Sequence, residues 1–192
     1  MIHSNNIIPT AFLDMVRKRR SIRRFLDKPV EREKIMSCIE AARLAPSAQN
    51  VQPWKFLVVD NPEIKKKFAD TVFSGIYSPS KFAAHAPVLI LQLASLDFIT
   101  NVIGKQIQNI HFYLIDSGIA GEHIVLQAAA LDLGTCWIGW FNMKKARKFF
   151  NIPKKYKLIN IFAVGYYEKK PAKEKKRKTL EEIVSFNEFT NK

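Results

Sequence analysis

The sequence predicts an α+β fold contained in one domain. Its 192 residues are 47% hydrophobic and 25% charged, a composition that suits a globular chain with a sizeable core. Short apolar runs typical of buried strands are interspersed with longer segments of helical periodicity. They do not alternate strictly, as a doubly wound parallel sheet would require. No repeat or Gly/Ser-rich linker divides the chain, so we expect residues 1–192 to form a single domain.

Helices in the first half are predicted from their start signals. Thr10 can cap a first helix that reaches about Arg19, because a Thr hydroxyl accepts from the free N–H groups of a first turn. A second helix is expected after Pro29. Asn61 followed by Pro62 provides a cap and a first-turn proline for a third.

Four strands and two further helices complete the prediction. A long helix over 109–133 is expected to end at Gly134, which would adopt a left-handed conformation as its C-cap. A short helix rich in Lys and Phe follows over 144–150. The expected strands are 55–60, 87–93, 135–140 and 158–167.

The long helix over 109–133 is apolar on nearly all sides. Gly118, Gly121 and the alanine run 128–130 would let another backbone approach it closely. The helix could be buried within its own domain or shared with a second subunit. We favour the second interpretation, because obligate dimer interfaces resemble a core cut in half. The sequence therefore predicts a homodimer.

The net charge of +14 attracts anions and raises the question of nucleic-acid binding. Lysine runs at 65–67, 144–145, 154–155 and 169–178 account for much of it, which favours a solvated surface and no specific nucleic-acid partner. Cys38 and Cys136 cannot form a disulfide framework, which favours a reducing compartment. Residues 1–9 do not form a signal peptide, and charged side chains interrupt the apolar stretch 110–133. We expect a cytoplasmic protein that does not bind a membrane.

Four motifs contain candidate functional residues. RRSIR at 19–23 offers planar paired donors for a phosphate or a carbonyl-rich ring, although a basic helix end would have the same composition. APSAQNVQPW at 45–54 is a rigid loop with amides that can read a heterocycle's edge, or simply a capped helix-to-strand loop. GTCWIG at 134–139 has glycines that permit close approach to a flat ligand, or merely mark strand ends. KKRKTLEEIV at 175–184 joins a basic run to an apolar patch.

The order of these motifs resembles the nitroreductase family of flavoproteins. RRSIR, APSxxNxQPW, a long helix rich in small residues, GTCWIG, VGY and KxRxxLEEIV follow one another from about Val16 to Val184. The resemblance implies an α/β/α sandwich with a central, mostly antiparallel sheet. It also implies a homodimer with two FMN sites at the subunit interface. Residues 168–192 would be a C-terminal extension that packs on the partner subunit.

The resemblance also implies which residues bind FMN. Arg19, Arg20, Ser21 and Arg23 would hold the phosphate, ribityl chain and pyrimidine edge, and Lys175 and Arg177 would close on the phosphate. Ile138 and Gly139 would lie beside flavin N5. The opposite subunit would contribute Pro46, Ser47, Ala48 and Asn50. The segment 73–108 matches the family least and would form a lid over the substrate.

The expected activity is that of an FMN-dependent oxidoreductase. NAD(P)H would be the co-substrate, and nitroaromatics, quinones or similar small molecules would accept the electrons in a ping-pong reaction. The flavin would perform the chemistry, so we predict no catalytic side chain and no metal site; the four histidines are scattered. Two alternatives stay open. One is a flavoenzyme of the same fold with another substrate, as in the deiodinase, dihydropteridine reductase and flavin-cleaving branches, and the other is a basic nucleic-acid-binding module.

Overall fold

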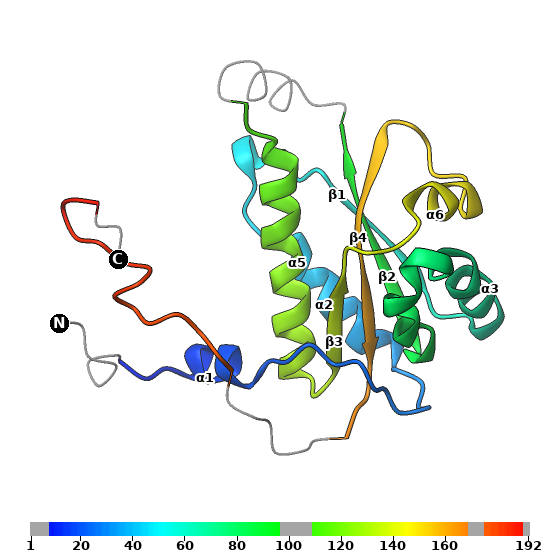
Figure 1. The fold of residues 1–192 in the computed structure, drawn as a ribbon, viewed down its shortest axis with the longest axis horizontal. Coiled ribbons are helices and arrows are strands. Elements are labelled where there is room, and N and C mark those ends of the chain that lie inside the picture. Colours follow the sequence, from blue (N-terminus) through cyan, green and yellow to red (C-terminus); the bar gives the residue numbers. More distant parts are fainter. Residues whose placement is uncertain (1–7, 97–108, 169–174, 190–192) are drawn as a thin grey trace.

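The computed structural model describes residues 8–96, 109–168 and 175–189 and confirms the α+β class (Figure 1). Helices and strands follow one another without strict alternation. In chain order they are α1 (Ala11–Lys18), α2 (Arg32–Arg43), the 3₁₀ turn η2 (Ala48–Asn50), β1 (Trp54–Val59), α3 (Pro62–Val72), the 3₁₀ segment η3 (Gly75–His85), β2 (Val88–Ser95), α5 (Phe112–Ala130), β3 (Gly134–Ile138), α6 (Met143–Phe149) and β4 (Tyr156–Gly165).

The four strands form one antiparallel sheet in the order β1-β2-β4-β3. Leu91 in the central strand β2 pairs with Leu57 of β1 and with Ile161 of β4. The register between β2 and β4 shifts at Gln92/Leu93. The sheet confirms the expected antiparallel arrangement and leaves β3 at one edge.

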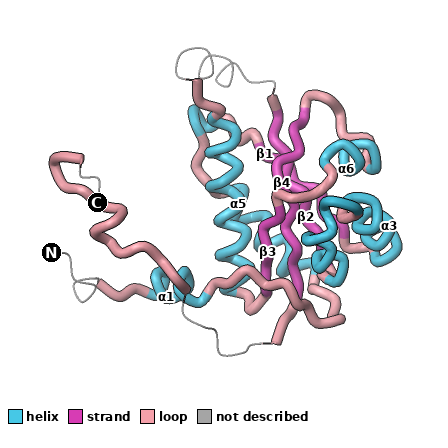
Figure 2. Tube along the Cα trace, viewed as in Figure 1, coloured by secondary structure: helices cyan, strands magenta, loops and turns pink. Residues whose placement is uncertain are grey.

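Helices cover both faces of this sheet, as the sandwich expectation required (Figure 2). Along β2, Val88 and Ile90 pack with residues of α2 and α5, whereas Leu89 and Leu91 pack with residues of α3 and α6. This alternation is the period-two side-chain pattern of a strand buried on both faces. It explains why β2 appears in the sequence as a continuous apolar run.

The predicted helix starts are confirmed by their caps. The Thr10 hydroxyl accepts from Leu13 N at 3.1 Å, and the Asn61 side chain accepts from Ile64 N at 3.0 Å. Pro62 occupies the first position of α3, where its missing N–H costs nothing.

The predicted end of the long helix is wrong. The helix α5 ends at Ala130, and the residue with a left-handed backbone is Asp132, at φ 61°. Leu133 N then donates back to Ala128 O at 2.8 Å, so the chain has already turned before Gly134. Gly134 is instead the first residue of β3. It lacks a side chain because a Cβ there would lie 2.7 Å from Ile22 Cγ1.

Most of the segment expected to form a lid belongs to the body of the domain. Residues 75–85 form η3, in which Ser80 and Ala83 are buried, and residues 88–95 are the central strand β2. The Ser80 hydroxyl donates to Trp140 O at 2.7 Å, which ties η3 to the end of β3. The remaining part of the hypothesis, residues 97–108, lies outside the described residues.

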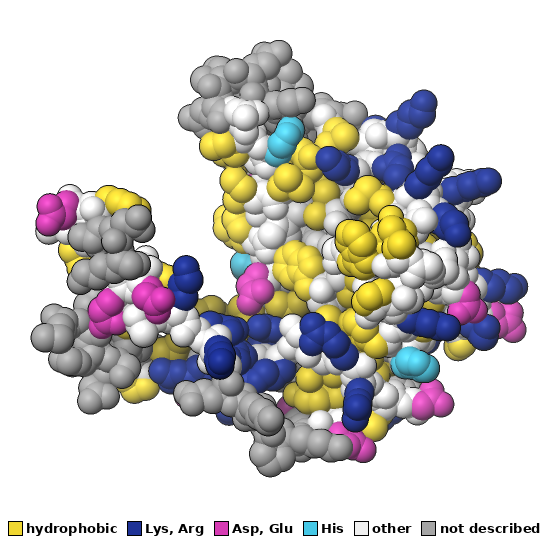
Figure 3. Space-filling view, viewed as in Figure 1, with side chains coloured by type: hydrophobic (Ala, Val, Ile, Leu, Met, Phe, Trp, Pro, Cys, Tyr) yellow, Lys and Arg dark blue, Asp and Glu magenta, His cyan; other side chains and the backbone are white. Residues whose placement is uncertain are grey.

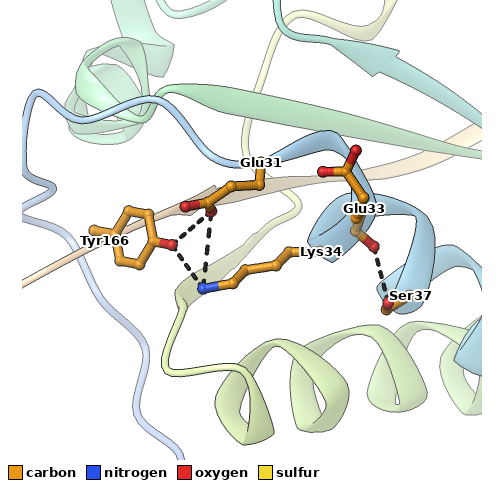
Figure 4. A network of polar contacts seen from close by, with 5 residues as sticks. All are labelled: Glu31, Glu33, Lys34, Ser37 and Tyr166. Carbon is orange, nitrogen blue, oxygen red and sulfur yellow. Dashed lines mark hydrogen bonds and ion pairs between the residues drawn. The ribbon is translucent and has the colours of Figure 1, made fainter.

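A polar network ties the end of β4 to the start of α2 (Figure 4). The Tyr166 hydroxyl donates to Glu31 Oε2 at 2.6 Å and accepts from Lys34 Nζ at 2.7 Å. These contacts lower the pKa of Glu31, chiefly through the hydrogen bond from Tyr166. The network fixes the segment that follows the sheet.

Candidate functional site

The basic segment 19–23 lies against the exposed edge of β3. Ile22 N donates to Thr135 O at 2.8 Å, and Ser21 pairs with Thr135 in a parallel bridge. The absence of a side chain at Gly134 permits this approach. Two motifs far apart in sequence, RRSIR and GTCWIG, therefore meet in one place.

The C-terminal basic motif reaches the same region. A cavity of about 480 Å³ is bounded by both basic motifs and by one residue of α5. Lys175 Nζ donates to Val16 O at 3.1 Å, which holds the C-terminal segment beside α1. The cavity is lined by Val16, Arg17, Arg19, Arg20, Glu122, Lys175 and Arg177.

The cavity concentrates positive charge. Burial lowers the pKa of Lys175, and the nearby cations Arg20, Arg19 and Arg177 lower it further, while Glu122 opposes them. Like charges held together repel one another, and an anion bound among them would relieve that repulsion. Guanidinium and ammonium donors together suit a phosphate group, so the residues present fit the phosphate end of FMN.

Arg20 also agrees with the other interpretation of the segment 19–23, that of a basic helix end. Its guanidinium donates to the carbonyls of Arg17 and Arg19 at the end of α1, the second at 3.0 Å. Basic side chains commonly bond the last carbonyls of a helix in this way. Arg20 thus stabilises the helix end and lines the cavity at once.

Ser21 and Arg23 lie on a neighbouring cavity of about 510 Å³, which Tyr167 also lines. The Arg23 guanidinium lies 5.8 Å from the centre of the Phe82 ring. Burial raises the pKa of the Cys136 thiol in β3, and the charges of Arg23 and Arg19 oppose that rise. Arg23 therefore places its charge close to β3 and does not line the basic cavity that contains Arg19 and Arg20.

The free edge of β3 offers backbone donors. Because the Thr135 carbonyl points outward to Ile22 and backbone groups alternate along a strand, the N–H of Trp137 lies on the same edge. Gly139 follows directly after the end of the strand. Ile138, by contrast, is buried in the core beside α3 and α6. No described atom would contact a Cβ built at Gly139, so its surroundings are open enough for a flat ligand.

The loop that follows α2 is rigid and polar. Ala48 N donates to Asp116 Oδ1 at 3.0 Å, and the Ser47 hydroxyl accepts from Gln52 N at 2.9 Å. Gln49 and Asn50 have positive φ angles of 52° and 54°. Burial raises the pKa of Asp116, and the hydrogen bond from Ala48 opposes that rise.

Within one chain this loop does not meet the basic cavity. Ala48 is attached near the start of α5 through Asp116, whereas Ile22 packs against Gly134, beyond the other end of the helix. From Asp116 the helix rises about 9 Å to Glu122, the α5 residue that lines the cavity, and roughly 20 Å to Ala130, at 1.5 Å per residue. No residue of the loop lines the cavity. Figure 1 shows the loop and the segment 19–23 near opposite ends of α5. Pro46, Ser47, Ala48 and Asn50 thus lie apart from the other predicted site residues.

Sequence reasoning missed three residues of this region: Arg17 and Glu122, which line the basic cavity, and Asp116, which holds the Ser47 loop. The last two had a signal, because they are the carboxylates that interrupt the apolar sequence of α5. Among the described residues, His, Cys, Asp and Glu form no group of three or more that could hold a metal ion. No helix in the described ranges is long and apolar enough to cross a membrane.

The remaining positive charge is spread over several elements. Figure 3 shows Lys and Arg side chains scattered over the α3 and α6 side of the molecule, with further ones near α1. The lysines of α3 and α6 lie on separate helices. This distribution favours a solvated basic surface over a single groove for a polymer.

A family model described as Nitroreductase family matches residues 16–166. The chain belongs to the nitroreductase family. A nitroreductase family protein of Clostridium difficile 630 superposes with a TM-score of 0.78 at 31% identity, over 94% of this chain and 100% of its own. An FMN-dependent nitroreductase of Clostridium difficile R20291 gives 0.75 at 30% identity, over 92% and 99%. An Archaeoglobus fulgidus protein provisionally named an NADH dehydrogenase/NAD(P)H nitroreductase is 31% identical over 158 residues, 80% of this chain and 84% of its own.

Proposed function

We propose that this member of the nitroreductase family is an FMN-dependent oxidoreductase. It takes electrons from NADH or NADPH and passes them to small-molecule acceptors such as nitroaromatics or quinones. The observation that supports this most directly is the convergence of Arg19, Arg20, Lys175 and Arg177 on one cavity, next to the segment that pairs with β3 at Ser21. The names of the relatives agree with the cofactor and with the reductant.

The protein's own residues bind and orient the cofactor in this proposal. When bound, FMN supplies hydride acceptance at its N5 atom and the return of electrons to the acceptor. Arg19, Arg20, Lys175 and Arg177 neutralise the phosphate, and Ser21 bonds the ribityl chain. Arg23 places positive charge at the pyrimidine edge, where it favours an electron-rich ring. The backbone of Ile138 and Gly139 borders the ring at the end of β3, while the Ile138 side chain stays in the core.

The site is completed by a second subunit. The Ser47 loop, with Pro46, Ala48 and Asn50, reaches the partner's cofactor, which agrees with the fact that none of these residues lines the basic cavity of its own chain. The helix α5 exposes Leu114 and Ile115, which a partner would cover.

The C-terminal extension, 168–192, packs on the partner subunit. Figure 1 shows that residues 175–189 extend away from the sheet, and Phe186 and Phe189 are exposed. Residues 169–174 and 190–192 of the extension lie outside the described residues. We place the enzyme in the cytoplasm, where Cys38 and Cys136 stay reduced.

One spectrum followed by kinetics tests the proposal. Purified protein should be yellow, should be bleached by NADH or NADPH under anaerobic conditions and should sediment as a dimer. Double-reciprocal plots at several acceptor concentrations should be parallel, because a single small site serves both substrates in turn. A colourless protein whose DNA affinity falls steeply with salt would contradict the proposal and favour a nucleic-acid-binding module.

A further inference from the structure

Trp140 follows Gly139 directly and is the most exposed of the three tryptophans, with 56% of its surface accessible. The sequence suggested that it would end a strand, but β3 ends at Ile138. Trp140 therefore lies on the connection between β3 and α6. Its indole is not part of the hydrophobic core, so core packing does not explain why so large an apolar side chain occupies this position.

The exposed indole is held in one orientation. Its Nε1–H donates to Ile76 O at 2.8 Å, and the Trp140 carbonyl accepts from the Ser80 hydroxyl at 2.7 Å. The ring also packs at a tilt of 50° against Tyr77, with centroids 5.3 Å apart. All of these partners belong to η3, so the fold fixes a large aromatic side chain without burying it.

Two residues close to Trp140 also expose apolar side chains: Ile76, whose carbonyl accepts from the indole, and Met143, three residues along the chain. Ile76 is 70% accessible and Met143, at the start of α6, is 38% accessible. A single exposed apolar residue on a protein surface needs no explanation. Several of them around a fixed aromatic ring are typical of a binding surface.

We propose that Trp140, Ile76 and Tyr77 form an aromatic platform that binds flat, uncharged aromatic acceptors such as quinones and nitroarenes. This inference rests on the proposed function, because Trp140 directly follows Gly139, at the end of β3 where the flavin ring is proposed to lie. Trp140 is a specificity-determining residue. It contacts the acceptor and takes no part in electron transfer.

The size of the platform favours a small molecule over a partner chain. A Trp side chain can bury at most about 250 Å², whereas a stable protein interface needs about 800 Å² from each partner. An indole flanked by one isoleucine matches one or two fused rings. Because the indole is already held by hydrogen bonds, little of its conformational freedom remains to be lost when an acceptor binds.

The test compares Trp140→Ala, Trp140→Phe and Ile76→Ala with the wild-type holoenzyme. The probe is 2-methyl-1,4-naphthoquinone, whose binding to the oxidised protein is measured by calorimetry and whose KM is measured with NADH. Stacking of aromatic rings predicts a Kd and a KM about five- to tenfold higher in Trp140→Ala. Trp140→Phe should stay within about twofold of wild type, and Ile76→Ala should show a smaller loss than Trp140→Ala.

Ferricyanide provides the matched control, because it accepts electrons and has no aromatic ring. Its KM and the dimer mass should not change in any variant. Four results in Trp140→Ala would each overturn the platform proposal: equal losses for both acceptors, loss of FMN, dissociation of the dimer, or unchanged quinone binding. A wild-type protein that contains no reducible flavin would instead contradict the proposed function.

Discussion

Removing one arginine from the basic cavity should weaken FMN binding without unfolding the protein. Arg177 and Arg19 come from opposite ends of the sequence and line the same cavity. The described neighbours of Arg177 include Lys175, whose pKa the surrounding cations lower. Arg177→Ala and Arg19→Ala each remove a donor for the phosphate and leave the hydrophobic core intact.

The size of the effect follows from the chemistry of the contact. A charge-assisted hydrogen bond contributes about 1.5–3 kcal/mol, so each substitution should weaken FMN binding by about ten- to a hundredfold. Riboflavin, which lacks the phosphate, should bind wild type and both variants with similar weak affinity. Lys176→Ala is the matched control, because Lys176 neighbours Arg177 in sequence but does not line the cavity.

Isothermal titration of FMN and riboflavin into the four apoproteins distinguishes the possible roles. If riboflavin loses as much affinity as FMN, these arginines support the fold or the ring and the phosphate assignment is wrong. If Lys176→Ala weakens FMN binding as much as Arg177→Ala, the effect comes from net charge and not from the cavity.

Three further predictions concern the rest of the fold. A Cβ at Gly121 would lie 2.3 Å from the half-exposed Trp137 ring and 3.0 Å from the buried Phe162 ring, so Gly121→Ala should cost about 1–3 kcal/mol and lower Tm. At Gly118 a Cβ meets no described atom, so any loss in Gly118→Ala must come from the partner and depend on protein concentration. Burial raises the pKa of the Cys38 thiol to about 12, so it should resist thiol reagents in the native state, and stability should fall as pH rises from about 9, where an unfolded thiol ionises. The pKa of Glu31 is lowered, so ionised Glu31 stabilises the fold at pH values above the ordinary pKa of a glutamate, and this stabilisation is lost as the pH falls and the carboxylate is protonated. Tyr166→Phe removes the hydrogen bond that chiefly causes the shift and should therefore flatten the acid limb of a curve of stability against pH.

Local signals predicted the helices well because their causes are local. The caps of α1 and α3 depend on residues three positions apart, Thr10 with Leu13 and Asn61 with Ile64. Such contacts are the same in any fold that contains these helices. The apolar runs likewise predicted the strands to within a few residues. In the central strand β2, burial on both faces leaves Gln92 as the one polar residue between Val88 and Ala94.

The predicted helix end failed because Gly134 is required by a contact with a residue distant in the sequence. Gly134 resembles a helix C-cap in sequence, yet Asp132 adopts the left-handed backbone and Gly134 makes room for Ile22. A pattern cannot show which distant side chain will approach a given backbone position. The lid hypothesis failed over residues 88–95 for a related reason, since only the tertiary structure shows that they form the central strand β2.

The sequence by itself determined the α+β class, the caps, the apolar strands and the residue types that an anionic flavin would need. Only the tertiary structure decided which of those residues share a cavity. It brought Arg19 and Arg20 together with Lys175 and Arg177, added Glu122, and left the Ser47 loop at the far end of α5. The physical reason is range: hydrogen-bonded caps and burial patterns act over a few residues, whereas a charged cavity exists only after the sheet and α5 have packed.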